Sequence, residues 1–142
     1  MAERGPIVVI EDDIDDREIL AEVFRDLAVK NEVLFFVSCD EAYAYLKKTA
    51  DKPFIIFSDI NLPGMTGSDL KRRINVDEKL RRKCIPFIFL STASEDELVL
   101  ISYELLAQGY FVKPSNIAAL KYMMEMILNY WHIARHPNPI LL

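Results

Sequence analysis

Short apolar runs alternate with longer segments in which apolar and polar residues recur with helical spacing. The apolar runs are rich in β-branched and aromatic residues and cover 7–10, 33–37, 54–57, 87–90 and 110–112. Runs of this length and composition are typical of strands buried on both faces. Apolar residues spaced by three and four predict helices over about 14–29, from 40 onward, over 68–74, 94–107 and 116–133.

Several local signals predict where these helices begin and end. Asp40 is a candidate N-cap for the second helix, and Ser94 precedes acidic residues that favour a helix start. Gly109 is expected to stop the fourth helix, and Ser115 or Asn116 to cap the last one.

The strand–helix alternation predicts an α/β domain with a parallel sheet covered on both faces. The order is strand, helix, repeated five times, and the highly charged stretch 75–83 is a helix extension or a surface loop. Neither a repeat nor a linker interrupts the pattern. We therefore expect one domain over residues 1–134, followed by a tail over 135–142.

Composition narrows the function classes. The chain has 142 residues, of which 51% are hydrophobic, so a sizeable core is expected. A net charge of −5 gives no basic footprint for nucleic acid. No apolar run approaches the roughly 20 residues that a membrane span needs. The two cysteines form no metal or redox motif, and the N-terminus lacks a signal-peptide pattern, so a cytoplasmic protein is expected.

Polar side chains follow four of the five predicted strands. They are Glu11, Asp12 and Asp13, then Asp59, then Ser91 and Thr92, and finally Lys113. Right-handed crossovers bring the carboxyl ends of parallel strands to one edge of the sheet. Clustered carboxylates repel one another, and their oxygens favour a hard divalent cation, Mg²⁺ with Mn²⁺ as an alternative. The next two acids, Asp15 and Asp16, are interpreted as solvated charge in the first helical turn.

This constellation resembles the receiver domain of two-component response regulators. The resemblance extends over about residues 7–131 and includes the segments Asp-Ile-Asn-Leu-Pro-Gly-Met (59–65) and Tyr-Phe-Val-Lys-Pro (110–114). It implies a flavodoxin-like three-layer fold, with a five-stranded parallel sheet in the order 2-1-3-4-5 and five helices. It also implies a stand-alone, chemotaxis-regulator-like receiver that passes its signal to a partner.

The resemblance assigns roles to the acidic residues. Asp59 is expected to accept the phosphoryl group and to bind the metal ion. Asp12 would be a direct metal ligand and Glu11 a ligand through water, with Asp13 as the alternate because three acids follow one another. The backbone carbonyl of Asn61 would complete the protein ligands.

The remaining roles fall on the fourth and fifth strands. Lys113 would stabilise the phosphoryl group, and Pro114 would follow a cis peptide bond. Counting from Pro86 and from Lys113 favours Ser91 over Thr92 as the switch hydroxyl. Tyr110 would be the aromatic residue that moves inward with it.

The expected partners are a sensor histidine kinase or a histidine phosphotransfer protein, by the same resemblance. The fourth helix, the fifth strand and the fifth helix carry more apolar residues than one buried stripe needs. We expect this face to serve self-association or output. The alternative is that the surplus packs under the apolar end of the tail, residues 140–142.

Other functions fit the pattern less well. An Asp-based, Mg²⁺-dependent phosphatase would carry its nucleophile after the first strand rather than the third. An FMN-binding flavodoxin would need a Ser/Thr/Gly-rich phosphate loop where this chain has acids. A phosphorylation-independent scaffold receiver would not need the complete set of acids, hydroxyl and lysine.

Overall fold

A computed structural model describes residues 4–137 of the chain. Within this range, the strands are β1 (Ile7–Ile10), β2 (Val33–Phe36), β3 (Ile55–Ser58), β4 (Phe87–Ser91) and β5 (Gly109–Val112). The helices are α1 (Ile14–Asp26), α2 (Cys39–Lys48), α3 (Gly67–Val76), α4 (Glu78–Arg81), α5 (Asp96–Glu104) and α6 (Ile117–Ile133).

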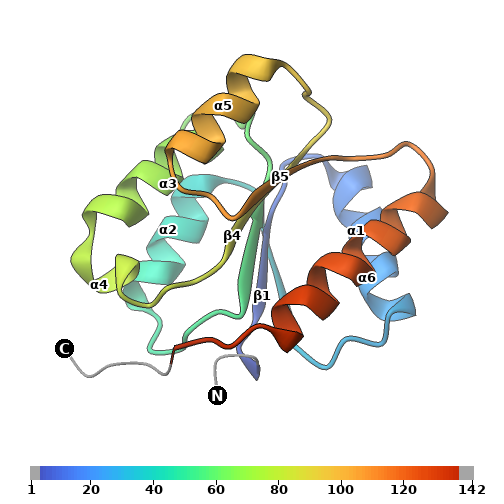
Figure 1. The fold of residues 1–142 in the computed structure, drawn as a ribbon, viewed down its shortest axis with the longest axis horizontal. Coiled ribbons are helices and arrows are strands. Elements are labelled where there is room, and N and C mark those ends of the chain that lie inside the picture. The colour runs from blue at the N-terminus through green and yellow to red at the C-terminus, as the bar shows by residue number, and fades with distance from the viewer. Residues whose placement is uncertain (1–3, 138–142) are drawn as a thin grey trace.

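The strands form one parallel sheet in the order β2-β1-β3-β4-β5, as expected. Helices α1 and α6 cover one face, and α2, α3, α4 and α5 lie on the other (Figure 1). The strand at the centre, β3, pairs with both β1 and β4, and its register places Ser58 beside Ile10 and Phe89. The three-layer α/β architecture is therefore confirmed.

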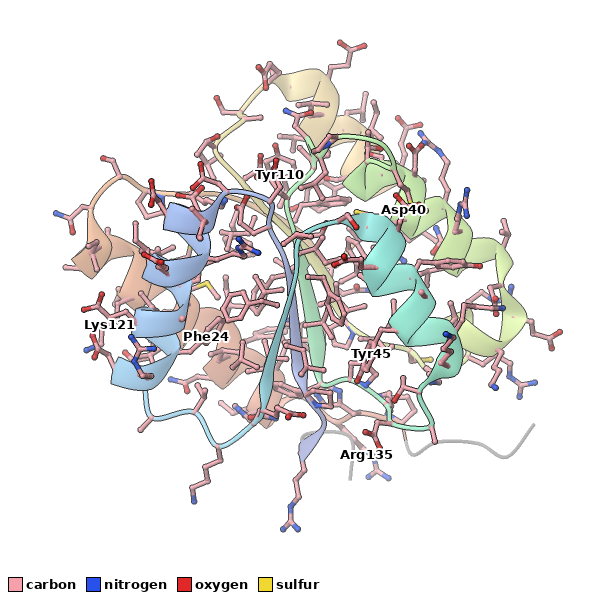
Figure 2. The ribbon with its side chains drawn as sticks, turned by 180° about the vertical axis from the view of Figure 1, so that it is seen from behind. Phe24, Asp40, Tyr45, Tyr110, Lys121 and Arg135 are labelled. Carbon is pink, nitrogen blue, oxygen red and sulfur yellow. The ribbon has the colours of Figure 1, made fainter. Side chains whose placement is uncertain are left out.

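Alternate residues of each strand enter two separate hydrophobic cores. In β1, Val8 and Ile10 pack under α2 and α3, whereas Ile7 and Val9 pack under α1 and α6. Figure 2 shows Phe24 and Tyr45 reaching toward the sheet from opposite faces. Because both faces are buried, the strands appear in the sequence as continuous apolar runs rather than as alternating ones.

The helix count differs from the expected five, because the charged stretch 75–83 ends α3 and then forms the one-turn helix α4. Asp77 causes the break: its backbone closes α3, and its side chain accepts the N–H of Leu80 to start α4. Leu80 is buried, which fixes the turn against the core.

Three of the predicted helix boundaries were wrong. Ser38 rather than Asp40 caps α2, by accepting the N–H of Glu41. Helix α5 begins after Glu95, not at Ser94, and has no side-chain cap. Gly109 opens β5, where a Cβ would lie 3.0 Å from the Phe111 ring, while α5 ends five residues earlier. The cap at Asn116 is confirmed.

No helix among the described residues is long and apolar enough to cross a membrane. In α6, the buried apolar residues are Leu120, Met124, Ile127 and Leu128. The alternative in which the surplus apolar residues pack under 140–142 lies outside the described residues.

Gly67 holds the loop between β3 and α3 close to the end of the central strand. Its N–H donates to the carbonyl of Ile60, and a Cβ added to it would lie 2.4 Å from the backbone oxygen of Asp59. The backbone oxygen of Asp59 cannot move away from such a Cβ unless the whole loop moves. Glycine is therefore required here for close approach rather than for a special backbone angle.

We expect Gly67→Ala to lower the free energy of unfolding by about 1–3 kcal/mol, because the added methyl overpacks the loop. Urea unfolding measures the change. Gly109→Ala is the matched control and should lose less stability. Its methyl meets a Phe111 side-chain atom at 3.0 Å rather than a backbone oxygen. Equal stability of Gly67→Ala and the unsubstituted protein would contradict this account of the loop.

Candidate functional site

The sheet's own hydrogen bonds position the residues that follow the strands. The N–H of Glu11 donates to the carbonyl of Phe36, and that of Asp59 to Ile10. The N–H of Lys113 donates to the carbonyl of Ser91 at 2.8 Å. The backbone ladder thus continues past the strands and fixes these residues at one edge of the sheet.

Asp59 lies at the centre of this edge, with both carboxylate oxygens engaged. Its Oδ1 accepts a hydrogen bond from Ser91 Oγ at 2.8 Å and one from the backbone N–H of Asn61 at 3.2 Å. Its Oδ2 lies 3.5 Å from Lys113 Nζ. The structure therefore brings a hydroxyl and an ammonium to opposite oxygens of one carboxylate.

The backbone of Asp59 is held by a buried hydroxyl. Ser58, at the end of β3, donates from Oγ to the carbonyl oxygen of Asp59 at 2.8 Å. Behind it lies the buried thiol of Cys39, whose pKa burial raises to about 12. This thiol is consequently a packing group beneath the site and not a nucleophile within it.

Lys113 is shared among three carboxylates, and its side chain is only 8% exposed. Its ammonium pairs with Glu11, lies 3.3 Å from Asp16 Oδ2 and reaches Asp59. Burial acts to lower the pKa of Lys113. The hydrogen bond to Glu11 and the surrounding negative charge outweigh burial and raise this pKa above its ordinary value.

Glu11 is the most deeply buried of the acids, at 2% exposure. One carboxylate oxygen pairs with Lys113, and the other accepts the N–H of Asp13 at 3.3 Å. Burial raises the pKa of Glu11, and the lysine and this N–H offset the rise in part. The charged form of Glu11 therefore depends on Lys113.

The two neighbouring acids, Asp12 and Asp13, differ in their contacts. Asp13 caps α1, where its Oδ1 accepts the N–H of Asp16 at 3.0 Å. Asp12 and Asn61 are exposed. Among residues 4–137, no three His, Cys, Asp or Glu side chains gather closely enough to hold a metal ion by themselves. A cation at this edge would need backbone oxygen or water as well, which suits Mg²⁺.

A chain of hydrogen bonds leads from Asp59 to β5. Ser91, which contacts Asp59, also accepts the N–H of Ala93 at 3.2 Å. The carbonyl of Ala93 in turn accepts from the Tyr110 hydroxyl at 2.7 Å. Thr92, the alternate to Ser91, is exposed. The loop between β4 and α5 thus joins the carboxylate to Tyr110.

Two expectations about this edge were wrong. No peptide bond among the described residues is cis, so Pro114 follows the trans bond that X–Pro sequences ordinarily prefer. Asp16 is not merely solvated charge, because it pairs with Lys113. The signal for this contact was helical phase: Asp16 lies four residues before the buried Leu20 and therefore on the face of α1 that meets the sheet.

The sequence also matches a known family over most of its length. Residues 7–125 match the family described as the response regulator receiver domain. The chain belongs to this family. Receiver domains are switches that accept phosphoryl groups from histidine kinases or phosphotransfer proteins, and they bind a divalent metal ion.

Similar proteins include a response regulator and a chemotaxis protein. Response regulator Rcp1 of Synechocystis sp. is 28% identical over 130 residues, covering 88% of this chain and 87% of Rcp1. Chemotaxis protein CheY-3 of Vibrio cholerae is 29% identical, covering 85% of this chain and 89% of CheY-3.

The crystal structure of the phosphorylated cyanobacterial phytochrome response regulator RcpA superposes with a TM-score of 0.84. It is 29% identical and covers 94% of this chain and 98% of RcpA. A crystal structure of Rcp1 holds Mn²⁺ and superposes with a TM-score of 0.81, at 27% identity over 94% of this chain and 99% of Rcp1. The flavodoxin-like fold of the receiver family is confirmed.

Replacing Lys113 by Met leaves the Glu11 carboxylate buried without its ammonium. We expect a loss of about 3–5 kcal/mol in the free energy of unfolding at neutral pH. The loss should shrink toward about pH 5, because the raised pKa of Glu11 lets the folded state keep a proton that the unfolded chain releases as pH rises.

Urea unfolding at the two pH values measures this difference. In the control, Glu11→Gln combined with Lys113→Met, no carboxylate needs protonation at position 11, so the loss should vary less with pH. A loss in Lys113→Met that is the same at both pH values would contradict the dependence of Glu11 on Lys113.

Proposed function

We propose that Asp59 is the residue that accepts the phosphoryl group. The observation that carries this proposal is the pair of contacts on its carboxylate, from the Ser91 hydroxyl and the Lys113 ammonium. An Asp59 oxygen would attack the phosphorus of a phosphohistidine. The new O–P bond forms as the P–N bond breaks, and the imidazole leaves with the electron pair of that bond.

The donor set at this edge fits Mg²⁺, with Mn²⁺ as an alternative. Asp12 and Asp59 would supply carboxylate oxygens and Asn61 its backbone carbonyl, while Glu11 would act through water. Asp12 fits a direct role better than Asp13, because the Asp13 carboxylate is already used as the cap of α1. When bound, the ion neutralises charge on the phosphoryl oxygens.

Lys113 and Ser91 hold the transferred group from the protein side. The transition state of phosphoryl transfer spreads negative charge over the three equatorial oxygens, so positioning and charge neutralisation supply most of the catalysis. Lys113 offers an ammonium and Ser91 a hydroxyl on opposite sides of Asp59. The protein's own chemistry is then limited to accepting the phosphoryl group and slowly losing it to water.

The loop from Ser91 to α5 serves as the switch. A phosphoryl group on Asp59 adds about 1.5–2 negative charges and three strong acceptors. The Ser91 hydroxyl would move toward these acceptors. Ala93 is hydrogen-bonded to Ser91, and Tyr110 is hydrogen-bonded to Ala93. A charge event at Asp59 is thereby converted into a change of the packing around α5 and β5.

The surface formed by α5, β5 and α6 would receive this change. Its exposed apolar side chains are Leu100, Tyr103, Leu106, Val112, Ile117, Tyr122, Met126, Tyr130 and Ile133. A groove of about 700 Å³ runs between β5 and α6 and is lined by Phe111, Tyr122, Met126 and Tyr130, among others. Exposed apolar patches of this kind mark sites of association. We assign this surface, the output face, to a homodimer or a target protein, with a sensor histidine kinase or phosphotransfer protein as the phosphate source.

Incubation with acetyl phosphate and Mg²⁺ should give one phosphate adduct by intact mass. Asp59→Asn should give none, because the amide is a poor nucleophile. Asp40→Asn is the matched control, an exposed acid at the start of α2 that should load normally (Figure 2). Absence of an adduct on the folded, unsubstituted protein would favour the scaffold alternative, and a persistent adduct on Asp59→Asn would place the acceptor elsewhere.

Light scattering during gel filtration tests the output face. We expect an acyl-phosphate mimic such as beryllofluoride to increase the dimer fraction, and Tyr122→Lys to reverse the increase by placing a charge in the groove. Val76→Lys, at an apolar residue that is 82% exposed on α3, is the control and should behave like the unsubstituted protein. A monomer in both states would exclude the dimer and leave target binding as the role of this face.

A further inference from the structure

Asp15 and Asp16 are chemically identical neighbours in the first turn of α1, but the structure separates their surroundings. Asp16 Oδ2 lies 3.3 Å from Lys113 Nζ, whereas Asp15 is exposed. The N–H of Asp16 is held by the Asp13 cap, so its side chain starts from a fixed point beside the site. The contact between Asp16 and Lys113 is therefore set by the geometry of the first turn of α1.

The three carboxylates around Lys113 differ in their freedom to release it. Glu11 is buried and anchored by the N–H of Asp13, and Asp59 is the proposed acceptor. Asp16 keeps 38% of its side chain exposed, so water can solvate its carboxylate when Lys113 leaves. Asp16 is thus the partner that Lys113 can exchange for phosphoryl oxygens at the least cost in desolvation.

We propose that Asp16 is a positioning residue that acts through Lys113 and slows phosphoryl loading of the receiver. This inference rests on the proposed role of Asp59. During loading, the ammonium has to turn from Asp16 toward the negative charge that develops on the phosphoryl group. Breaking the Asp16 pair raises the barrier to loading.

The same exchange should affect loading and loss of phosphate differently. In the loaded protein, Lys113 already faces the phosphoryl group, both before and during attack by water. Asp16 therefore changes the free energy of the starting state and of the transition state of hydrolysis by the same amount. Its influence should appear in the rate of loading and largely cancel in the rate of dephosphorylation.

The test compares Asp16→Asn, Asp16→Glu and Asp15→Asn in the full chain, each loaded by acetyl phosphate at saturating Mg²⁺. Intact mass follows loading, and removal of the donor then starts the dephosphorylation time course. We expect Asp16→Asn to load about threefold to fivefold faster, the range that one partly exposed ion pair supports. Its dephosphorylation rate should change by less than about twofold.

The two other variants separate the ion pair from general charge. Asp15→Asn removes the same charge from the same helical turn, and Asp16→Glu keeps the charge, so both should load like the unsubstituted protein. Equal acceleration in Asp15→Asn and Asp16→Asn, or unchanged or slower loading in Asp16→Asn, would overturn the role of Asp16. Absence of any adduct on the unsubstituted protein would instead overturn the proposed function of Asp59.

Discussion

The site depends on one buried ammonium placed among three carboxylates. Lys113 pairs with Glu11, Asp16 and Asp59 across the ends of β1, β3 and β5 and the start of α1. An ammonium in this position holds together acids that would otherwise repel one another. The site still carries more negative than positive charge, which favours a divalent cation. The backbone hydrogen bonds of the sheet set the architecture of this edge, and the charge imbalance accounts for its preference for a cation.

Helix α5 lies between the site and the exposed apolar surface, and its two ends are held with different strength. At the far end of α5, the side-chain amide of Asn75 donates to the carbonyl of Leu105, and Lys71 donates to the same amide from the other side. The near end begins after Glu95 without a side-chain cap. Ala93, which is hydrogen-bonded to Ser91 and Tyr110, lies in the loop just before this weaker end. In the proposed switch, a shift of the loop before α5 would therefore tilt the helix about its more firmly held end.

Much of this arrangement could be predicted from the sequence because it rests on periodicity and strand ends. Strands buried on both faces appear as apolar runs, and residues directly after them, such as Asp59 and Lys113, lie at one edge of a parallel sheet. The helix starts are harder to predict from the sequence. Ser38 and Asp40 are both good N-caps, and the choice between them depends on where the chain leaves β2. Residue type does not distinguish Asp16 from Asp15, so the sequence predicts solvated charge at both positions. The helical phase of Asp16 does distinguish it, but only when the buried face of α1 is used to orient it toward Lys113.

The contact between Ser91 and Asp59 also constrains how the switch can work. Ser91 donates to the carboxylate oxygen itself, at 2.8 Å. A phosphoryl group bonded to Asp59 places its oxygens beyond that carboxylate, so a hydroxyl that stays bonded to the acceptor has to move outward from the strand end. Ser91 is the last residue of β4, where the ladder to Lys113 resists movement, whereas the following residues are free of the sheet. In the proposed switch, the loop that carries Ala93 would take up the displacement, and Tyr110 would move with it because its hydroxyl donates to the Ala93 carbonyl.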